Sequence, residues 1–149
     1  MRKFEIVSIY KDKNINLPKR ATTHSAGYDL EAAETITLKP FKMGDLPYYI
    51  PTGIKAKYPI NEFLMIVNRS GGPKRGLFMT NGIGIIDSDY YNNPDNEGHI
   101  MVQLINITNK DITINKGDRI AQGIFCKYYK TSNDETTKKR TGGHGSTGK

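Results

Sequence analysis

The sequence contains no tryptophan and only one cysteine, Cys126. A single cysteine cannot form a disulfide bond within the chain, and it cannot supply a cysteine-rich zinc site. Disulfide-stabilised secreted proteins are therefore excluded as a class. A reducing compartment fits this cysteine usage, so we expect a cytoplasmic protein.

Long apolar runs are also missing. The longest strictly apolar run has five residues, 63–67 (FLMIV), whereas a helix that spans a bilayer needs about 20. The first residues, MRKFE, do not lead into the apolar region of a secretion signal. We therefore expect neither membrane spanning nor secretion, and the 149 residues leave room for one folded domain.

Acidic residues are in the minority. The chain has 22 Lys and Arg against 15 Asp and Glu, which gives a net charge of +7. Such a surface attracts polyanions, and either a nucleic acid or a small phosphate-bearing ligand would fit. No four consecutive residues are basic, and no basic stretch alternates with aromatic residues, so nucleic acid is the less favoured partner.

Short runs rich in Ile, Val, Phe and Tyr dominate the pattern, and turn residues such as Asn81-Gly82 and Lys116-Gly117 separate them. No segment of 11 or more residues has a helical period, and at most a short helical turn is expected after Arg69. The pattern predicts an all-β barrel or jelly roll. The expected strands are residues 4–10, 50–57, 63–67, 83–86, 100–107 and 120–129.

The last 19 residues have a different composition. Residues 131–149 contain no Ile, Leu, Val, Phe, Met, Tyr or Trp, so they cannot bury enough apolar surface to fold alone. We therefore divide the chain into a body, residues 1–130, and a mobile arm, residues 131–149. The glycines of 142–148 could wrap a phosphate with successive backbone N–H groups, or they could form a plain flexible tail.

Five segments carry the chemistry of the chain. In their order and spacing they resemble the five motifs of the trimeric dUTP pyrophosphatases (dUTPases) of bacterial or phage type, over residues 22–148. The segments are 26–30 (AGYDL), 69–71 (RSG), 81–90 (NGIGIIDSDY), 117–122 (GDRIAQ) and 142–148 (GGHGSTG).

This resemblance implies a distorted jelly roll, or β-clip barrel, that assembles as a homotrimer with shared active sites. It also implies hydrolysis of dUTP to dUMP and pyrophosphate with Mg²⁺, in the cytoplasm of a bacterium or a phage-infected cell. Asp87 matches the aspartate that orients the water attacking the α-phosphorus. Considered alone, Asp87 could also be a turn aspartate that bonds its own backbone.

The base and the sugar have their own set of matching residues. Asn81-Gly82 is typical of a hairpin turn, and in the family this hairpin pairs with uracil through its backbone and the asparagine amide. Tyr90 matches the tyrosine that packs under deoxyribose and excludes a ribose 2′-hydroxyl, although it could also be an ordinary aromatic in a strand. The residues implied for base and sugar are Asn81, Gly84, Ile86, Tyr90 and His144.

A third set matches the family's phosphate and metal contacts. Asp29 corresponds to the aspartate that meets magnesium through water, and Asp118-Arg119 could be a structural ion pair at the start of a strand. The residues implied for phosphate are Arg69, Ser70, Gly71, Gln122, Lys139, Arg140, Ser146 and Thr147.

The sequence departs from the family pattern at three places. The second motif spans eight residues from Arg69 to Gly76 instead of nine, with Pro73 where a short helix would begin or break. In the fifth motif, Lys139 stands at the family's arginine position with Arg140 beside it, and we favour Arg140 because arginine grips phosphate with two donors. His144 stands where the family has an aromatic, usually phenylalanine.

Two other functions remain open at this point. The related deaminase of dCTP shares the fold but needs a glutamate in the pocket, and the nearest candidates are Glu62 and Glu97. An insertion at residues 92–97, which we expect to be a surface loop, could instead contact a repressor protein, as in some phage relatives.

Overall fold

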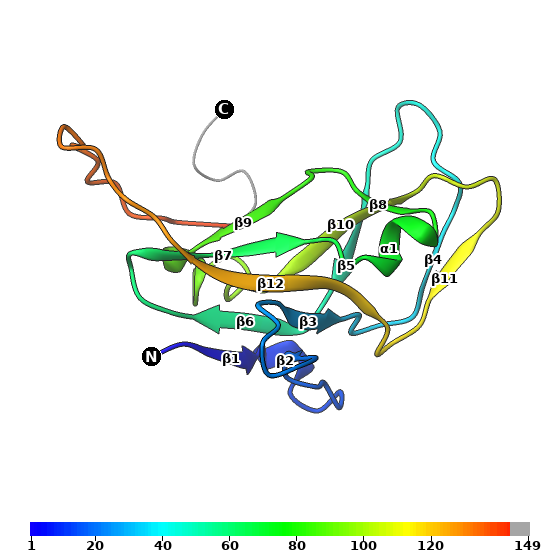
Figure 1. Cartoon of the computed structure of the whole chain (residues 1–149), viewed down its shortest axis with the longest axis horizontal. Coiled ribbons are helices and arrows are strands. Elements are labelled where there is room, and N and C mark those ends of the chain that lie inside the picture. Colours follow the sequence, from blue (N-terminus) through cyan, green and yellow to red (C-terminus); the bar gives the residue numbers. More distant parts are fainter. Residues whose placement is uncertain (144–149) are drawn as a thin grey trace.

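The computed structural model describes residues 1–143 of the chain, and their regular secondary structure is almost entirely strand (Figure 1). A five-stranded sheet has the order β2-β3-β12-β7-β9, and a three-stranded sheet has the order β5-β10-β8. Two pairs, β1 with β6 and β11 with β4, complete the body. The strands are β1 (Lys3–Ile6), β2 (Lys19–Arg20), β3 (Tyr28–Glu31), β4 (Ile36–Leu38), β5 (Tyr48–Pro51), β6 (Ile54–Lys57), β7 (Glu62–Val67), β8 (Leu77–Met79), β9 (Gly84–Asp87), β10 (Met101–Asn106), β11 (Ile112–Ile114) and β12 (Arg119–Lys127).

The sheets enclose one main core. Residues alternate between buried and partly exposed along β7 and β10, as expected for strands with one face turned inward. Leu30, Leu64 and Leu104 are among the fully buried side chains. Burial of each such side chain stabilises the fold by about 1.5–3 kcal/mol, so this core fixes the strands that carry the site. The all-β prediction is confirmed.

Two predicted strands are interrupted. The run 4–10 gives β1 and then a 3-10 helix, Ser8–Tyr10. The run 50–57 divides into β5 and β6 because Gly53 has a φ of +71° and the Thr52 hydroxyl donates a hydrogen bond to the carbonyl of Ile100 (2.6 Å). The prediction that each of these two segments forms one continuous strand was therefore wrong.

The predicted hairpin at Asn81-Gly82 is a turn between two sheets. Gly82 has a φ of +64°, and its N–H donates to the carbonyl of Met79 (3.0 Å), so the chain does reverse there. However, β8 pairs with β10, whereas β9 pairs with β7. The two strands flanking this turn thus belong to different sheets, and the space between them is available for a pocket.

The short helical turn predicted after Arg69 is α1, Gly71–Lys74. Pro73 is tolerated inside it because the first N–H groups of any helix have no partner within the helix. Arg75, which follows, lies 3.8 Å from the Asp118 carboxylate, so its charge is paired within the body.

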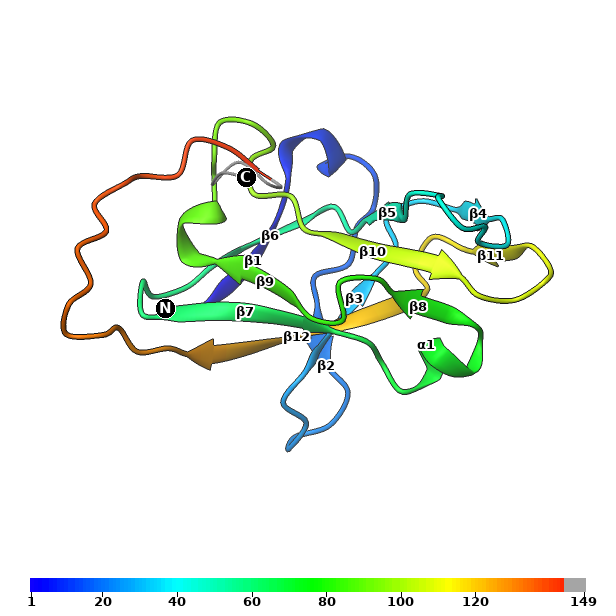
Figure 2. The same ribbon diagram turned by 90° about the horizontal axis from the view of Figure 1, so that it is seen from above.

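Beyond β12 the chain leaves the body in a wide arc and returns to it, as Figure 2 shows. Residues 128–143 form no strand or helix. Because the arm has no large apolar side chains, it contacts the body through polar groups and glycines. The Arg140 side chain is only 12% exposed, and Gly142 and Gly143 are buried. No helix among the described residues is long and apolar enough to cross a membrane.

Candidate active site

A pocket of about 220 Å³ opens between β9 and β10, where the two sheets separate. Drug-sized ligands occupy pockets of about 300–1,000 Å³, so this pocket suits a base and sugar, with any phosphates outside it. The polar and charged residues that line it are Asn81, Asp87, Tyr90, Gln103 and Arg140.

Strand β9 forms one wall and is an edge of the five-stranded sheet. In an antiparallel ladder only alternate residues bond to the neighbouring strand, so the others turn their N–H and C=O groups outward. Gly84 keeps this wall accessible, because a Cβ there would lie 3.2 Å from Ile66 Cβ and 3.5 Å from the Asn81 amide nitrogen. The wall therefore offers backbone donors and acceptors beside an amide side chain.

Tyr58 holds β9 from behind. Its hydroxyl donates a hydrogen bond to the carbonyl of Ile86 (2.6 Å). Burial raises the pKa of Tyr58, which keeps that hydroxyl protonated and able to donate. The sequence offered no signal for this role, because Tyr58 and Ile86 are brought together only by the folding of β6, β7 and β9.

Asp87 ends β9 at the mouth of the pocket, and its side chain is about half exposed. Arg140 of the arm places one guanidinium nitrogen 2.6 Å from Asp87 Oδ2 and another 2.7 Å from Asp89 Oδ1. The guanidinium also lies 5.9 Å from the centre of the Tyr90 ring. The arginine thus joins two carboxylates at the pocket, whereas Lys139 is exposed.

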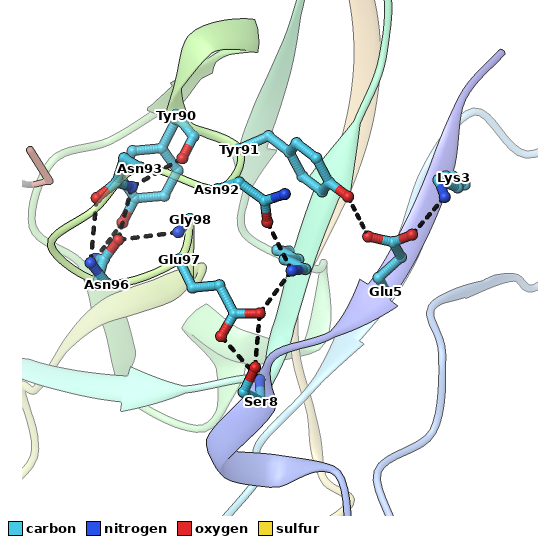
Figure 3. A network of polar contacts seen from close by, with 11 residues as sticks. Lys3, Glu5, Ser8, Tyr90, Tyr91, Asn92, Asn93, Asn96, Glu97 and Gly98 are labelled. Atoms are coloured by element: carbon cyan, nitrogen blue, oxygen red, sulfur yellow. Dashed lines mark hydrogen bonds and ion pairs between the residues drawn. The ribbon is translucent and has the colours of Figure 1, made fainter. Parts of the chain in front are cut away.

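Tyr90 is buried and belongs to a 3-10 helix, Ser88–Tyr90, and not to a strand. Its hydroxyl donates to the carbonyl of His99 (2.9 Å) and accepts from the amide of Asn96 (2.7 Å). Tyr91 points the other way and donates to Glu5 of β1 (Figure 3). The 3-10 helix and the residue after it thus direct the two neighbouring rings to opposite sides.

A second polar cluster lies where β3, β7 and β12 meet. Arg69 donates to Asp29 (2.7 Å), and Arg119 lies 3.4 Å from the other oxygen of that carboxylate. Gln122 donates to the backbone carbonyl of Asn68 (3.1 Å). Ser70 and Gly71 lie exposed at the start of α1, next to Arg69. The sequence had suggested an ion pair between Asp118 and Arg119. Arg119 is instead paired with Asp29.

The strand register separates the two clusters. Asp87 lies opposite Phe63, whereas Gln122 lies opposite Val67 at the far end of β7. Four residues of strand span roughly 13 Å, so these two levels of β7 are well separated. One chain therefore brings Asp87, Asn81, Tyr90 and Arg140 together and leaves Asp29, Arg69, Ser70 and Gln122 in a separate place.

The glutamates needed for the deaminase alternative are engaged elsewhere. Glu62 forms an ion pair with Arg2, and Glu97 accepts from Lys55 (2.6 Å). Neither lines the pocket. Three residues implied for base and phosphate, His144, Ser146 and Thr147, lie outside the described residues.

The predicted surface loop at residues 92–97 turns several polar side chains inward. Asn93 is 5% exposed, and Asn96 reaches the Tyr90 hydroxyl. The segment is at the surface as expected, since Asn92, Pro94 and Asp95 are exposed, but the amides of Asn93 and Asn96 also satisfy buried polar groups.

A family model described as dUTPase matches residues 13–149. The chain belongs to the dUTPase family. It is 50% identical to the deoxyuridine 5'-triphosphate nucleotidohydrolase of Lactococcus lactis, over 99% of this chain and 98% of that protein. It is 44% identical to the protein of the same name from Rickettsia prowazekii, over 95% of this chain and 96% of that protein.

Solved structures of dUTPases have the same fold. The crystal structure of dUTPase from Streptococcus mutans superposes with a TM-score of 0.81 at 40% identity, over 88% of this chain and 99% of that one. A mutant dUTPase from phage phi11 of S. aureus, whose structure details the coordination of a structural Mg(II) ion, superposes with a TM-score of 0.73. At 19% identity, over 93% of this chain and 97% of that one, it supports the fold alone.

Proposed function

We propose that this dUTPase hydrolyses dUTP to dUMP and pyrophosphate at a site built from two separated clusters. The observation that carries the proposal is Asp87 at the open end of an edge strand, beside a pocket of base-and-sugar size. The activity limits uracil incorporation into DNA and supplies dUMP for thymidylate synthesis.

Asp87 acts as the general base. Its carboxylate holds a water molecule, takes one proton from it, and directs the oxygen to the α-phosphorus of dUTP. The bond between that phosphorus and the oxygen bridging to the β-phosphorus breaks, and pyrophosphate leaves. A positioned base of this kind contributes about 10²–10⁴-fold to the rate.

Selection of the base follows from the open edge of β9. Uracil and cytosine present opposite donor and acceptor patterns, so backbone groups that satisfy one leave polar groups unpaired with the other. The Asn81 amide adds a side-chain partner. Tyr90, packed beneath the sugar, leaves no room for a ribose 2′-hydroxyl.

The separation of the clusters supports a shared site. Asp87 and Gln122 lie at levels of β7 that are roughly 13 Å apart, so one chain does not hold both groups against the same end of the triphosphate. Copies of the chain would combine Asp87 of one with Arg69, Ser70, Gly71 and Gln122 of another. A homotrimer with cyclic symmetry closes such contacts, and the exposed Tyr49 and Phe78 on the three-stranded sheet suit burial between copies.

The arm is long enough to act within its own chain or across to a neighbour. It leaves β12 at Lys127, and Lys127 pairs with Glu62, next to the Phe63 that faces Asp87. The 13 residues from 128 to 140 can extend roughly 40 Å, far more than this return requires. We propose the division into a body, 1–130, and an arm, 131–149; Arg140 lies against Asp87 of its own chain in this structure, and in the proposed trimer the arm would make the same contact on a neighbouring copy.

Magnesium would bind together with the triphosphate. Residues 1–143 contain no group of three or more His, Cys, Asp or Glu arranged for a metal ion. Asp29 fits contact through water, since Mg²⁺ keeps several waters and prefers substrate phosphates. Arg69 and Arg119 make the surroundings of Asp29 positive, which disfavours a cation there on its own. The phosphates of the substrate are therefore needed to bind the ion as well. When bound, the ion would neutralise charge on the triphosphate.

The same proposal covers location and partners. We place the enzyme in the cytoplasm of a bacterium or a phage-infected cell, with dUTP and copies of itself as partners. A repressor-type partner at residues 92–97 stays a proposal: Asn93, Asn96 and Glu97 bond within the chain, which leaves the exposed Asn92, Pro94 and Asp95 for such a contact. Nucleic acid binding is tested by salt titration with a random duplex, where a log–log slope near zero excludes it.

The decisive experiment compares pyrophosphate release from dUTP, dCTP, dTTP and UTP under identical conditions. We expect dUTP to be hydrolysed with a large preference over the other three. Comparable rates with dCTP or UTP would contradict the proposed pocket.

A further inference from the structure

The segment that follows Tyr90 closes tightly on itself. Asn92 and Glu97 have φ values of +56° and +63°, and the Asn92 N–H donates to the Glu97 carbonyl (3.1 Å). Gly98 ends the closure with a φ of +82°, and a Cβ there would lie 2.6 Å from the carbonyl oxygen of Tyr90. We call residues 91–98 the tyrosine loop. Its backbone is fixed against the residue it follows.

Asn93 organises the inside of this loop (Figure 3). Its side-chain oxygen accepts from the N–H groups of Asp95 and Asn96, both at 3.1 Å. Its amide nitrogen donates to the Tyr90 carbonyl and to the Asn96 side-chain oxygen, both at 2.8 Å. Asn93 therefore determines where the Asn96 side chain lies.

The orientation of the Asn96 amide follows from its partners. Its oxygen accepts from Asn93 and from the Gly98 N–H (3.1 Å). The nitrogen must then face outward from the loop, where it donates to the Tyr90 hydroxyl (2.7 Å). That hydroxyl donates in turn to His99 (2.9 Å), so its proton is directed away from Asn96.

A separate anchor ties the loop to the body. The Glu97 carboxylate accepts from the backbone N–H of Ser8 (2.9 Å), from the Ser8 hydroxyl (3.0 Å) and from Lys55 (2.6 Å). Lys55 also donates to the Asn92 side chain (2.7 Å). The loop is thus held from β6 and the N-terminal segment on one side and reaches Tyr90 on the other.

We propose that Asn96 is a positioning residue that fixes the Tyr90 ring and thereby sets the preference for deoxyribose over ribose. The inference rests on the proposed function, in which Tyr90 packs beneath the sugar. Steric rejection of one hydroxyl requires a ring that does not recede and so make room for the extra oxygen. The Asn96 hydrogen bond opposes that movement.

The test is the ratio of kcat/KM for dUTP to kcat/KM for UTP. Asn96→Ala should lower this ratio about three- to tenfold, the effect of one hydrogen bond. Asn92→Asp is the matched control, because it replaces an amide of the same loop, still accepts from Lys55, tolerates the positive φ and does not touch Tyr90; its ratio should equal that of the natural protein.

A double-mutant cycle separates positioning from general loosening. In a Tyr90→Phe background, which lacks the hydroxyl, Asn96→Ala should leave the ratio unchanged. A ratio altered less than twofold by Asn96→Ala alone, or altered equally in both backgrounds, overturns the inference. Should Asn96→Ala not fold, Asn96→Ser serves, because its shorter side chain cannot reach the Tyr90 hydroxyl. A natural protein that fails to hydrolyse dUTP contradicts the proposed function instead.

Discussion

Gly27 is the position where the smallest change should have the clearest effect on the phosphate cluster. It precedes β3 and lies against Gln122 of β12. A Cβ at residue 27 would lie 2.1 Å from Gln122 Oε1 and 2.9 Å from its Cδ. Because a Cβ atom does not approach another heavy atom this closely, Gly27→Ala must displace the Gln122 side chain.

The size of the effect follows from what Gln122 loses. Its hydrogen bond to the Asn68 carbonyl (3.1 Å) is broken, which costs about 0.5–1.5 kcal/mol of stability. Its proposed contact with the triphosphate is lost too, and a hydrogen bond to a charged group is worth about 1.5–3 kcal/mol. We therefore expect kcat/KM for dUTP to fall roughly 10- to 150-fold, with the fold retained.

The assay is steady-state pyrophosphate release, and thermal unfolding checks the fold. Gly72→Ala in α1 is the matched control, because its Cβ would meet nothing closer than 3.6 Å. Gln122→Ala should resemble Gly27→Ala, and the double variant should be no worse than Gln122→Ala. Natural activity in Gly27→Ala, or fully additive losses in the double variant, would refute the reasoning.

Three further predictions concern the proposed general base Asp87, the arm and the Glu97 ion pair. Asp87→Asn should bind nucleotide and keep its fold but lose about 10²–10⁴-fold in kcat; turnover above a tenth of normal contradicts this. A chain ending at Thr131 should stay trimeric by sedimentation yet be nearly inactive, and mixing it with full-length Asp87→Asn chains should restore activity only if the arm crosses between copies. Lys55 and Ser8 hold the pKa of Glu97 at about 2, below its usual value of 4.5. The Glu97 pair therefore stabilises the fold above about pH 4.5 and is lost as the pH falls toward 2, so Glu97→Gln should flatten the fall of Tm over this range.

The sequence predicted long strands better than short ones. Strands β7, β10 and β12 have six to nine residues, enough for the alternation of buried and exposed positions to be recognised. Strands β4, β8 and β11 have three residues each and show no usable period. Their place in the fold is decided by partners distant in the sequence, such as Thr37 opposite Thr113.

Motif residues that are close in sequence do lie together in the structure. Asn81, Asp87 and Tyr90 come together within ten residues of chain, and all three line the pocket. Tyr58 and Asn96 were missed, because one acts across 28 residues and the other through a loop whose closure depends on three positive φ values. Nothing in the composition of either segment distinguishes a supporting residue from an ordinary polar one.

The position of β9 at the edge of its sheet has a consequence for self-association. An open strand edge can accept a strand from another molecule and so begin aggregation. Two carboxylates, Asp87 and Asp89, stand at the end of this edge, and Arg140 of the arm lies across them. These charges discourage a foreign strand from adding to the sheet. Variants that neutralise Asp87 therefore remove a charge that opposes aggregation, in addition to the proposed general base.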